Sequence, residues 1–171
     1  MNIETLRLRI RDFITEDAVD LQEILGDAET MAHCEPPYDM EKTKQFLHDF
    51  CIEKKGAMAA VQKESGKVIG YILFNSFGEG EYEIGWIFNR AYWRRGYAYE
   101  ACSAVIGYAF GQLKARRIFA ETVDLEKSVP LMCKLGMHKA GVEQICVENK
   151  QMEMHLYGLA ENEWRQHGDC V

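Results

Sequence analysis

The sequence predicts a single α/β domain in which helices cover both faces of a mixed, mostly antiparallel sheet of about seven strands. Three observations support this fold class. Several short segments alternate apolar and polar residues, as strands with one buried face do. The segment 97–113 carries apolar residues at the spacing of one helix face. This helix follows one predicted strand and precedes another, which is the order of a parallel crossover.

Length and charge limit the class of protein further. The chain has 171 residues, so we expect one domain spanning 1–171. Its formal net charge is -7, with 20 basic and 27 acidic residues, and we therefore expect no nucleic-acid partner. The N-terminal residues lack the pattern of a signal peptide. The sequence also contains no apolar stretch of about 18 residues, the length that a membrane-spanning helix needs. These features favour a cytoplasmic protein that does not bind membranes.

The cysteines and histidines do not suggest a metal site. Neither residue type shows the spacing of zinc ligands, so we expect no metal. Most cysteines have apolar neighbours, which favours small reduced core residues. The six cysteines are Cys34, Cys51, Cys102, Cys133, Cys146 and Cys170.

The N-terminal part of the chain predicts a strand and two helices. Leu6, Leu8 and Ile10 alternate with arginines, which indicates a strand with Leu6 on its buried side. Thr15 is the expected N-cap of a first helix that ends at Gly26. After the break at the two prolines of "CEPPYD", a second helix is expected over 39–55.

Three strands and the long helix come next. The segments 57–62, 68–77 and 82–88 are separated by short connections that contain glycine, so we expect an antiparallel meander. The helix 97–113 leads to a strand over 118–123. A further helix ends before Gly136, and two strands follow near 140–147 and 151–157.

The turn that starts the long helix is the first candidate site. It reads "AYWRRGYAYE". Gly96 allows a tight turn and a close approach by an anion, while Arg94 and Arg95 supply charge-assisted donors for phosphate oxygens. The helix start adds N–H groups with partial positive charge. On these residues alone, a phosphate site and a solvated turn are equally supported, and a Rossmann site is disfavoured because two of its three glycines are missing.

The run "EIGWIFNRAYWRRGYAYEA", followed by a strand and then "KLGM", resembles the GNAT superfamily of N-acetyltransferases. It is most similar to the Rim-type branch, which acetylates the N-termini of ribosomal proteins. The resemblance spans residues 6–164. The family pattern Q/R-x-x-G-x-G/A falls on residues 93–98, with Trp93 in place of Gln or Arg, as is common in the Rim-type branch.

The resemblance implies acetyl-CoA as the acetyl donor. The turn would hold the CoA pyrophosphate through the amides of residues 94–99, and Lys134 would face the phosphates. The main chain of Trp86 and Phe88 would pair with pantetheine as an added strand does. The implied cofactor-binding residues are Trp86, Phe88, Arg94, Arg95, Gly96, Tyr97, Ala98, Tyr99 and Lys134.

The resemblance also implies catalytic groups for amide formation, which needs a neutral amine, a stabilised oxyanion and a proton for the departing thiolate. Glu83 is our first candidate for the base, acting through water, and Glu81 is the second. The amide of Phe88 is the implied oxyanion donor. Ser128 matches a family serine and is the candidate proton donor, although it equally fits a helix N-cap.

Some family residues are absent. The tyrosine that many members use as proton donor is replaced by Met132, and an asparagine is replaced by Leu125. For Lys134, a helix-end lysine that interacts with the helix dipole is an alternative reading. Tyr157 is either a substrate-side hydroxyl or a half-buried strand residue.

The predicted function is transfer of an acetyl group from acetyl-CoA to a primary amine, by direct attack in a ternary complex. The acceptor is a protein N-terminus or a small-molecule amine, and residues 34–38 are expected to shape its binding site. A non-catalytic acyl-CoA sensor is the alternative, and acetylation of aminoacyl-tRNA is a third hypothesis. Either a monomer or a homodimer fits the sequence.

Overall fold

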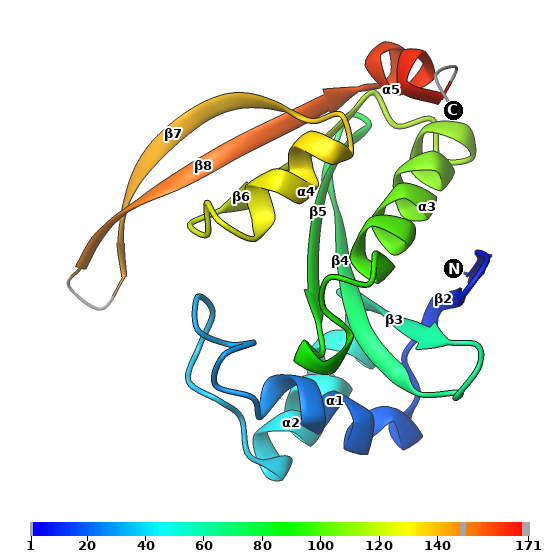
Figure 1. Ribbon diagram of the computed structural model, residues 1–171, viewed down its shortest axis with the longest axis vertical. Coiled ribbons are helices and arrows are strands. Elements are labelled where there is room, and N and C mark those ends of the chain that lie inside the picture. Colours follow the sequence, from blue (N-terminus) through cyan, green and yellow to red (C-terminus); the bar gives the residue numbers. More distant parts are fainter. Residues whose placement is uncertain (1, 148–149, 169–171) are drawn as a thin grey trace. The chain divides into compact units, whose positions relative to one another are not determined.

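The computed structural model describes residues 2–147 and 150–168 and has a mixed α/β fold (Figure 1). Its eight strands form a sheet in the order β1-β2-β3-β4-β5-β6-β8-β7. The pairs β1–β2, β2–β3, β3–β4, β6–β8 and β7–β8 are antiparallel, whereas β5 and β6 are parallel. The predicted mixed and mostly antiparallel sheet is thus confirmed, with the short β1 as an additional strand.

The bounds of the elements agree closely with the predicted segments. The strands are β1 (Asn2–Glu4), β2 (Leu8–Asp12), β3 (Ala57–Gln62), β4 (Val68–Gly78), β5 (Glu81–Phe88), β6 (Arg117–Thr122), β7 (His138–Val147) and β8 (Lys150–Ala160). The α-helices are α1 (Ala18–Leu25), α2 (Met40–Phe46), α3 (Tyr97–Gly111), α4 (Ser128–Lys134) and α5 (Glu161–Gly168). Shorter turns are η1 (Thr15–Asp17) and η3 (Arg90–Tyr92), and η2 (Leu47–Glu53) is a π-helix that extends α2.

The chain forms two compact units. The first comprises residues 1–74 and 86–105, and the second comprises 75–85 and 106–171. Strands β4 and β5 and helix α3 contribute residues to both units.

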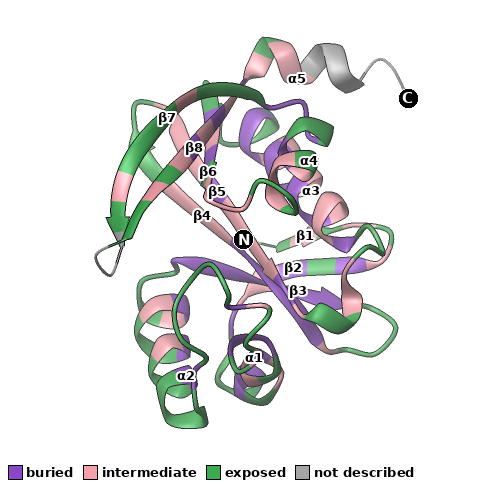
Figure 2. Cartoon of the chain, turned by 60° about the vertical axis from the view of Figure 1, so that its left-hand side comes forward, coloured by how far each residue is buried: buried purple, intermediate pink, exposed green. Residues whose placement is uncertain are grey.

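In the first unit, β3 is buried along its whole length (Figure 2). Because side chains alternate along a strand, its two faces contact different partners. Ala57, Ala59 and Val61 pack in one core cluster with residues of α1, η2 and β4. On the opposite face, the amide of Gln62 donates to the hydroxyl of Tyr97 at the start of α3. Helices therefore cover both faces of this strand, as predicted.

Two details of the N-terminal segment correct the sequence-based prediction. Leu6 is 89% exposed and lies between β1 and β2, so the buried alternation begins only at Leu8. Thr15 is the first residue of η1 instead of a cap. The carboxylate of Asp17 accepts a hydrogen bond from the amide of Ile14 and forms an ion pair with Arg11. These two contacts stabilise the start of η1.

In the second unit, β6 pairs with β8 along its full length, from Arg117 opposite Ala160 to Thr122 opposite His155. β7 and β8 form a long antiparallel pair with an irregularity between Lys139 and Gly141. Helix α4 ends as predicted, because Gly136 adopts the left-handed backbone conformation with φ at 82°.

Helix α3 is shorter than predicted, and the cysteines do not all lie in the core. The helix ends at Gly111, and Leu113 is 37% exposed, because Lys114 takes a positive φ and turns the chain away. Cys51 and Cys102 are buried as expected, but three cysteines are exposed, namely Cys34, Cys133 and Cys146. Cys170 lies outside the described residues.

Candidate functional site

The turn between β5 and α3 has a backbone conformation suited to an anion. Arg94 and Gly96 have φ angles of 59° and 80°, and Arg95 between them is not in this left-handed region. Such alternation turns successive N–H groups toward one side and forms a concave anion site. A left-handed conformation is unfavourable for a residue with a side chain, so the strain at Arg94 must be offset by its surroundings.

The start of α3 continues this concave surface. The carbonyl of Gly96 accepts from the amide of Glu100 at 3.0 Å, which makes Gly96 the residue that precedes the first helical turn. The first amides of an α-helix have no carbonyl partner within the helix, and here these include the amides of Tyr97 and Ala98. Together with the exposed Arg94 and Arg95, they provide donors and positive charge for a phosphate group. A pyrophosphate-bearing ligand such as CoA fits this donor set.

Gly96 and Tyr97 have roles that the sequence did not indicate. A Cβ atom on Gly96 would lie 3.4 Å from Nη2 of Arg7, an ordinary contact distance, so Gly96 is adjacent to a guanidinium from another part of the chain and its φ of 80° is what favours glycine. The side chain of Tyr97 is buried and its hydroxyl accepts from Gln62 at 2.9 Å. Only the main chain of Tyr97 is thus available to a ligand.

The end of β5 is fixed by two contacts. The indole Nε1 of Trp93 donates to the carbonyl of Phe88 at 2.7 Å. A Cβ atom on Gly70 would lie 2.4 Å from the ring of Phe88, so the buried ring fills the space above this glycine. Trp86, on the same strand, is half-buried.

The parallel pair ends before β5 does. Its register runs from Glu81 opposite Arg117 to Glu83 opposite Phe119. Beyond Glu83, β5 continues to Phe88, and β6 continues to Thr122 in register with β8. The register with β6 thus covers only the first residues of β5.

Glu83 is half-buried and lies in the second unit. Partial burial raises the pKa of its carboxyl, and the charge of Glu121 on β6 raises it further. A hydrogen bond with Asn75 on β4 acts in the opposite direction, but the pKa stays above the usual range for glutamate. A carboxylate with a raised pKa is a better proton acceptor, which suits a general base. The carboxylate of Glu81, the second candidate, forms an ion pair in which its Oε1 lies 4.0 Å from Nη1 of Arg117.

Ser128 and Lys134 are the first and last residues of α4. Lys127 occupies the N-cap position, so the N-cap interpretation of Ser128 is wrong. Ser128 is half-buried, whereas Lys134 is exposed. Both residues belong to the second unit with Glu83, and residues 86–99 belong to the first.

The positions that depart from the family pattern have different surroundings. Met132 is 1% exposed and is a core residue of α4. Leu125 is 50% exposed in the loop before this helix. Tyr157 on β8 is buried, with 7% of its surface exposed, which agrees more with a packing role than with the alternative of a substrate-side hydroxyl.

Four residues around the site were missed by sequence reasoning. They are Arg7, Asn75, Glu100 and Glu121. Arg7 was overlooked because it alternates with apolar residues in the same way as Arg9 and Arg11. This pattern predicts that all three arginines lie on the outer face of one strand. The parallel crossover indicates only that β5 and β6 belong to one sheet; the register, in which residues 83 and 119 are paired, places Glu121 two residues further on the same face.

The described part of the chain contains neither a cluster of metal ligands nor a membrane-spanning helix. Within residues 2–147 and 150–168, His, Cys, Asp and Glu do not gather into a group that would hold a metal ion. None of the helices in these ranges combines the length and the apolar character needed to span a membrane.

The fold is that of an α/β protein in which a turn with left-handed backbone at Arg94 and Gly96 leads into a crossover helix. Comparison with known proteins identifies the family. Residues 7–138 match the family model "Acetyltransferase (GNAT) domain", and the chain belongs to the GNAT acetyltransferases. It is an N-acetyltransferase, and acetyl-CoA is the co-substrate used throughout this family.

The chain is similar to an uncharacterized N-acetyltransferase, YnaD of Bacillus subtilis (strain 168), with 33% identity over 96% of this chain and 99% of the relative. It is also similar to the crystal structure of a GNAT-family acetyltransferase from Bacillus anthracis. That structure has 28% identity, a TM-score of 0.87, and coverage of 95% of this chain and 99% of its own.

A further structural neighbour is the ribosomal-protein-S5-alanine acetyltransferase of Vibrio fischeri. It has 20% identity, a TM-score of 0.77, and coverage of 96% of this chain and 98% of its own. At this identity, the likeness demonstrates a common fold.

Proposed function

We propose that this N-acetyltransferase binds the pyrophosphate of acetyl-CoA at residues 94–99 and transfers the acetyl group directly to a primary amine. The observation that carries the proposal is the left-handed backbone at Arg94 and Gly96, directly before the first turn of α3. Arg94 and Arg95 add charge to the site, and the amides from Arg94 to Tyr99 donate. Lys134 is a further candidate for contact with the phosphates, and interaction with the dipole of α4 is its alternative role.

The pantetheine arm pairs with the main chain of β5 at Trp86 and Phe88 in this proposal. The support is that the register with β6 covers only Glu81–Glu83, while β5 continues to Phe88. Main-chain donors and acceptors at the edge of a strand bind an extended ligand as an added strand. The contact between Trp93 and Phe88 stabilises the end of this strand.

Glu83 is the proposed general base. Its carboxylate removes a proton from the acceptor ammonium, through a water molecule, and leaves a neutral amine. The amine nitrogen attacks the thioester carbonyl, and the amide of Phe88 donates to the developing oxyanion. The carbon–sulfur bond then breaks, the hydroxyl of Ser128 supplies a proton to the thiolate of CoA, and the serine oxygen takes up the proton that the acceptor nitrogen loses as the amide forms. The raised pKa of Glu83 supports its role, because proton transfer is most efficient when the pKa lies near the working pH.

The acceptor that we propose first is the N-terminal amine of a protein, and a small-molecule amine is the second candidate. The Rim-type pattern of residues 93–98 supports this order. The net charge of -7 favours a cationic acceptor through long-range attraction.

An acceptor screen tests the proposal. The protein is incubated with acetyl-CoA and a panel of N-terminal peptides, polyamines, amino acids and aminoglycosides, and the release of CoA thiol is measured. Isothermal titration with CoA is run in parallel. We expect CoA to bind and at least one primary amine to stimulate thiol release. Absence of CoA binding would overturn the assigned co-substrate site. Tight binding without amine-dependent thiol release would favour the sensor alternative.

A further inference from the structure

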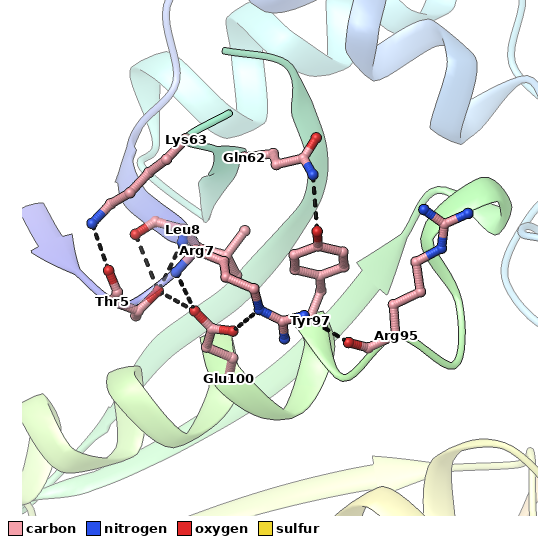
Figure 3. A network of polar contacts seen from close by, with 8 residues as sticks. All are labelled: Thr5, Arg7, Leu8, Gln62, Lys63, Arg95, Tyr97 and Glu100. Atoms are coloured by element: carbon pink, nitrogen blue, oxygen red, sulfur yellow. Dashed lines mark hydrogen bonds and ion pairs between the residues drawn. The ribbon is translucent and has the colours of Figure 1, made fainter. Parts of the chain in front are cut away.

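Arg7 contacts the candidate CoA turn from a distant part of the sequence (Figure 3). It lies between β1 and β2, and its Nη1 donates to the carbonyl of Arg95 at 2.9 Å. Its Nε donates to Oε2 of Glu100 at 2.7 Å. One guanidinium thus joins the middle residue of the turn to the first part of α3.

Glu100 is held by several donors from the same N-terminal segment. Its Oε1 accepts from the hydroxyl of Thr5 at 2.6 Å and from the amide of Arg7 at 2.7 Å. Partial burial opposes ionisation of Glu100, but these bonds and the charge of Arg7 outweigh it and keep the pKa of the carboxyl below its usual range. Glu100 is therefore ionised at neutral pH and fixes the orientation of Arg7.

The guanidinium of Arg7 lies over the aromatic ring of Tyr97. The Cζ atom of Arg7 lies 4.2 Å from the centre of this ring, which is a cation–π contact. The ring cannot turn away freely, because it is buried and its hydroxyl accepts from Gln62. Nη2 of Arg7 lies directly beside the turn, 3.4 Å from the position that a Cβ atom on Gly96 would take.

We propose that Arg7 is a positioning residue for acetyl-CoA, which keeps the turn 94–96 in its anion-binding conformation. This inference rests on the proposed function of the turn. The bond to the Arg95 carbonyl orients the following peptide unit, whose N–H belongs to Gly96. The same bond between Arg7 and the Arg95 carbonyl also offsets the unfavourable left-handed conformation of Arg94.

The role requires arginine and not only a positive charge. A guanidinium offers donors in a planar fork, so it can bond the Glu100 carboxylate and the Arg95 carbonyl together while it stacks on Tyr97. The ammonium of a lysine is a compact charge without that planar geometry. Arg7→Lys therefore preserves the net charge of the protein and removes the positioning function.

The test compares Arg7→Lys with the matched control Arg9→Lys. Arg9 lies two residues away and pairs with Glu4 at 2.6 Å, but both members of that pair are exposed on β1 and β2 and do not bond the turn. We expect the Kd for CoA, measured by isothermal titration, to rise about tenfold in Arg7→Lys and to stay within about twofold in Arg9→Lys. Hydrogen exchange of the amides at 94–99 should become faster only in Arg7→Lys.

Kinetics separate positioning from general damage. With an accepted amine, the KM for acetyl-CoA should rise in Arg7→Lys, while kcat at saturating acetyl-CoA and the KM for the amine remain near the wild-type values. Circular dichroism and a melting curve verify that the variant is folded. If Arg7→Lys proves unstable, Glu100→Gln provides the second variant, since it removes the charge that orients Arg7 and should raise the Kd in the same direction.

The possible failures are distinguishable. If the wild-type protein does not bind CoA, the proposed function is wrong. If the wild-type protein and Arg9→Lys bind CoA and folded Arg7→Lys binds it equally well, the proposed function stands and the role of Arg7 is overturned. Equal losses in Arg7→Lys and Arg9→Lys would also contradict the inference, because they would indicate a general effect of the N-terminal segment.

Discussion

The indole nitrogen of Trp93 donates a hydrogen bond to the main-chain carbonyl of Phe88 at 2.7 Å. This bond closes the segment between the end of β5 and the turn that precedes α3. It gives a structural role to the residue at which the chain departs from the general family pattern of Gln or Arg. The same carbonyl belongs to the residue whose amide we propose as the oxyanion donor.

Replacement of Trp93 by Phe should therefore weaken the site while keeping an aromatic ring. The variant loses the bond to Phe88, and a bond of this kind contributes about 0.5–1.5 kcal/mol. We expect kcat/KM for acetyl-CoA to fall between about threefold and tenfold on this basis. Trp164→Phe is the control, because the ring of Trp164 packs at a tilt against that of Phe110 in the second unit. An equal loss in both variants would argue against a specific role for Trp93.

Gly70 should not tolerate a side chain. A Cβ atom at this position would lie 2.4 Å from the Phe88 ring, which is buried and has little room to move. We expect Gly70→Ala to lower the free energy of unfolding by about 1–3 kcal/mol and to reduce acetyl transfer. Urea denaturation measures the first effect. Gly111→Ala is the control, because its added Cβ meets nothing within 4 Å, and it should leave stability unchanged or raise it.

Glu83→Gln should lower kcat by at least about a hundredfold if Glu83 is the general base. The affinity for CoA should remain near wild type, because the carboxylate acts on the acceptor. Glu81→Gln serves as the control, since Glu81 lies near Arg117 and is only the second candidate. Thiol-release kinetics with an accepted amine give the comparison. A wild-type rate in Glu83→Gln would refute the assignment.

The same substitution should affect stability in a pH-dependent way. Partial burial and the charge of Glu121 raise the pKa of Glu83 in the folded protein, so the folded state binds its proton more strongly than the unfolded state. Ionisation of Glu83 therefore costs stability as pH rises from the unfolded value, about 4.3, through the raised folded value. Glu83→Gln should melt at a higher temperature than wild type at pH 7–8. This difference in melting temperature should shrink below about pH 4, where the carboxyl group of Glu83 is protonated in both the folded and the unfolded protein.

Ser128→Ala tests the proton donor. Loss of the hydroxyl should reduce kcat by about tenfold or more and leave the KM for acetyl-CoA unchanged, because only departure of the thiolate is affected. Stability should change little, since Lys127 and not Ser128 occupies the cap of α4. Unchanged kcat over the alkaline pH range would exclude Ser128 as the proton donor. Ser103→Ala, also a half-buried helical serine, controls for loss of a hydroxyl elsewhere.

The local patterns of the sequence were sufficient to predict most of the fold. The strands at 57–62 and 82–88, with their short connections that contain glycine, and the apolar face of α3 are set by residues close together in the chain, and these elements were confirmed. Gly136 was correctly placed after α4, because few residues other than glycine favour the left-handed conformation there. The tight turn predicted at Gly96 depends on the same preference, since Gly96 has a φ of 80°.

Contacts between distant residues could not be predicted in this way. Leu6 continues the apolar alternation in sequence, yet it is exposed, since the chain leaves the strand between β1 and β2. The partners of Arg7 and the proximity of Glu121 to Glu83 depend on how the strands are ordered in the sheet. The shorter α3 depends on Lys114, whose positive φ is not typical of lysine.

The bond between Arg7 and Glu100 joins residues that lie 93 positions apart in the sequence. Closing so large a loop of chain is slow compared with forming a helix or a turn, so the turn 94–96 acquires its support late in folding. A ligand that binds only the supported turn then favours the completed molecule over partly folded ones. Acetyl-CoA that binds the supported turn, as we propose, would thus stabilise the folded chain and lower the fraction that is open to proteolysis.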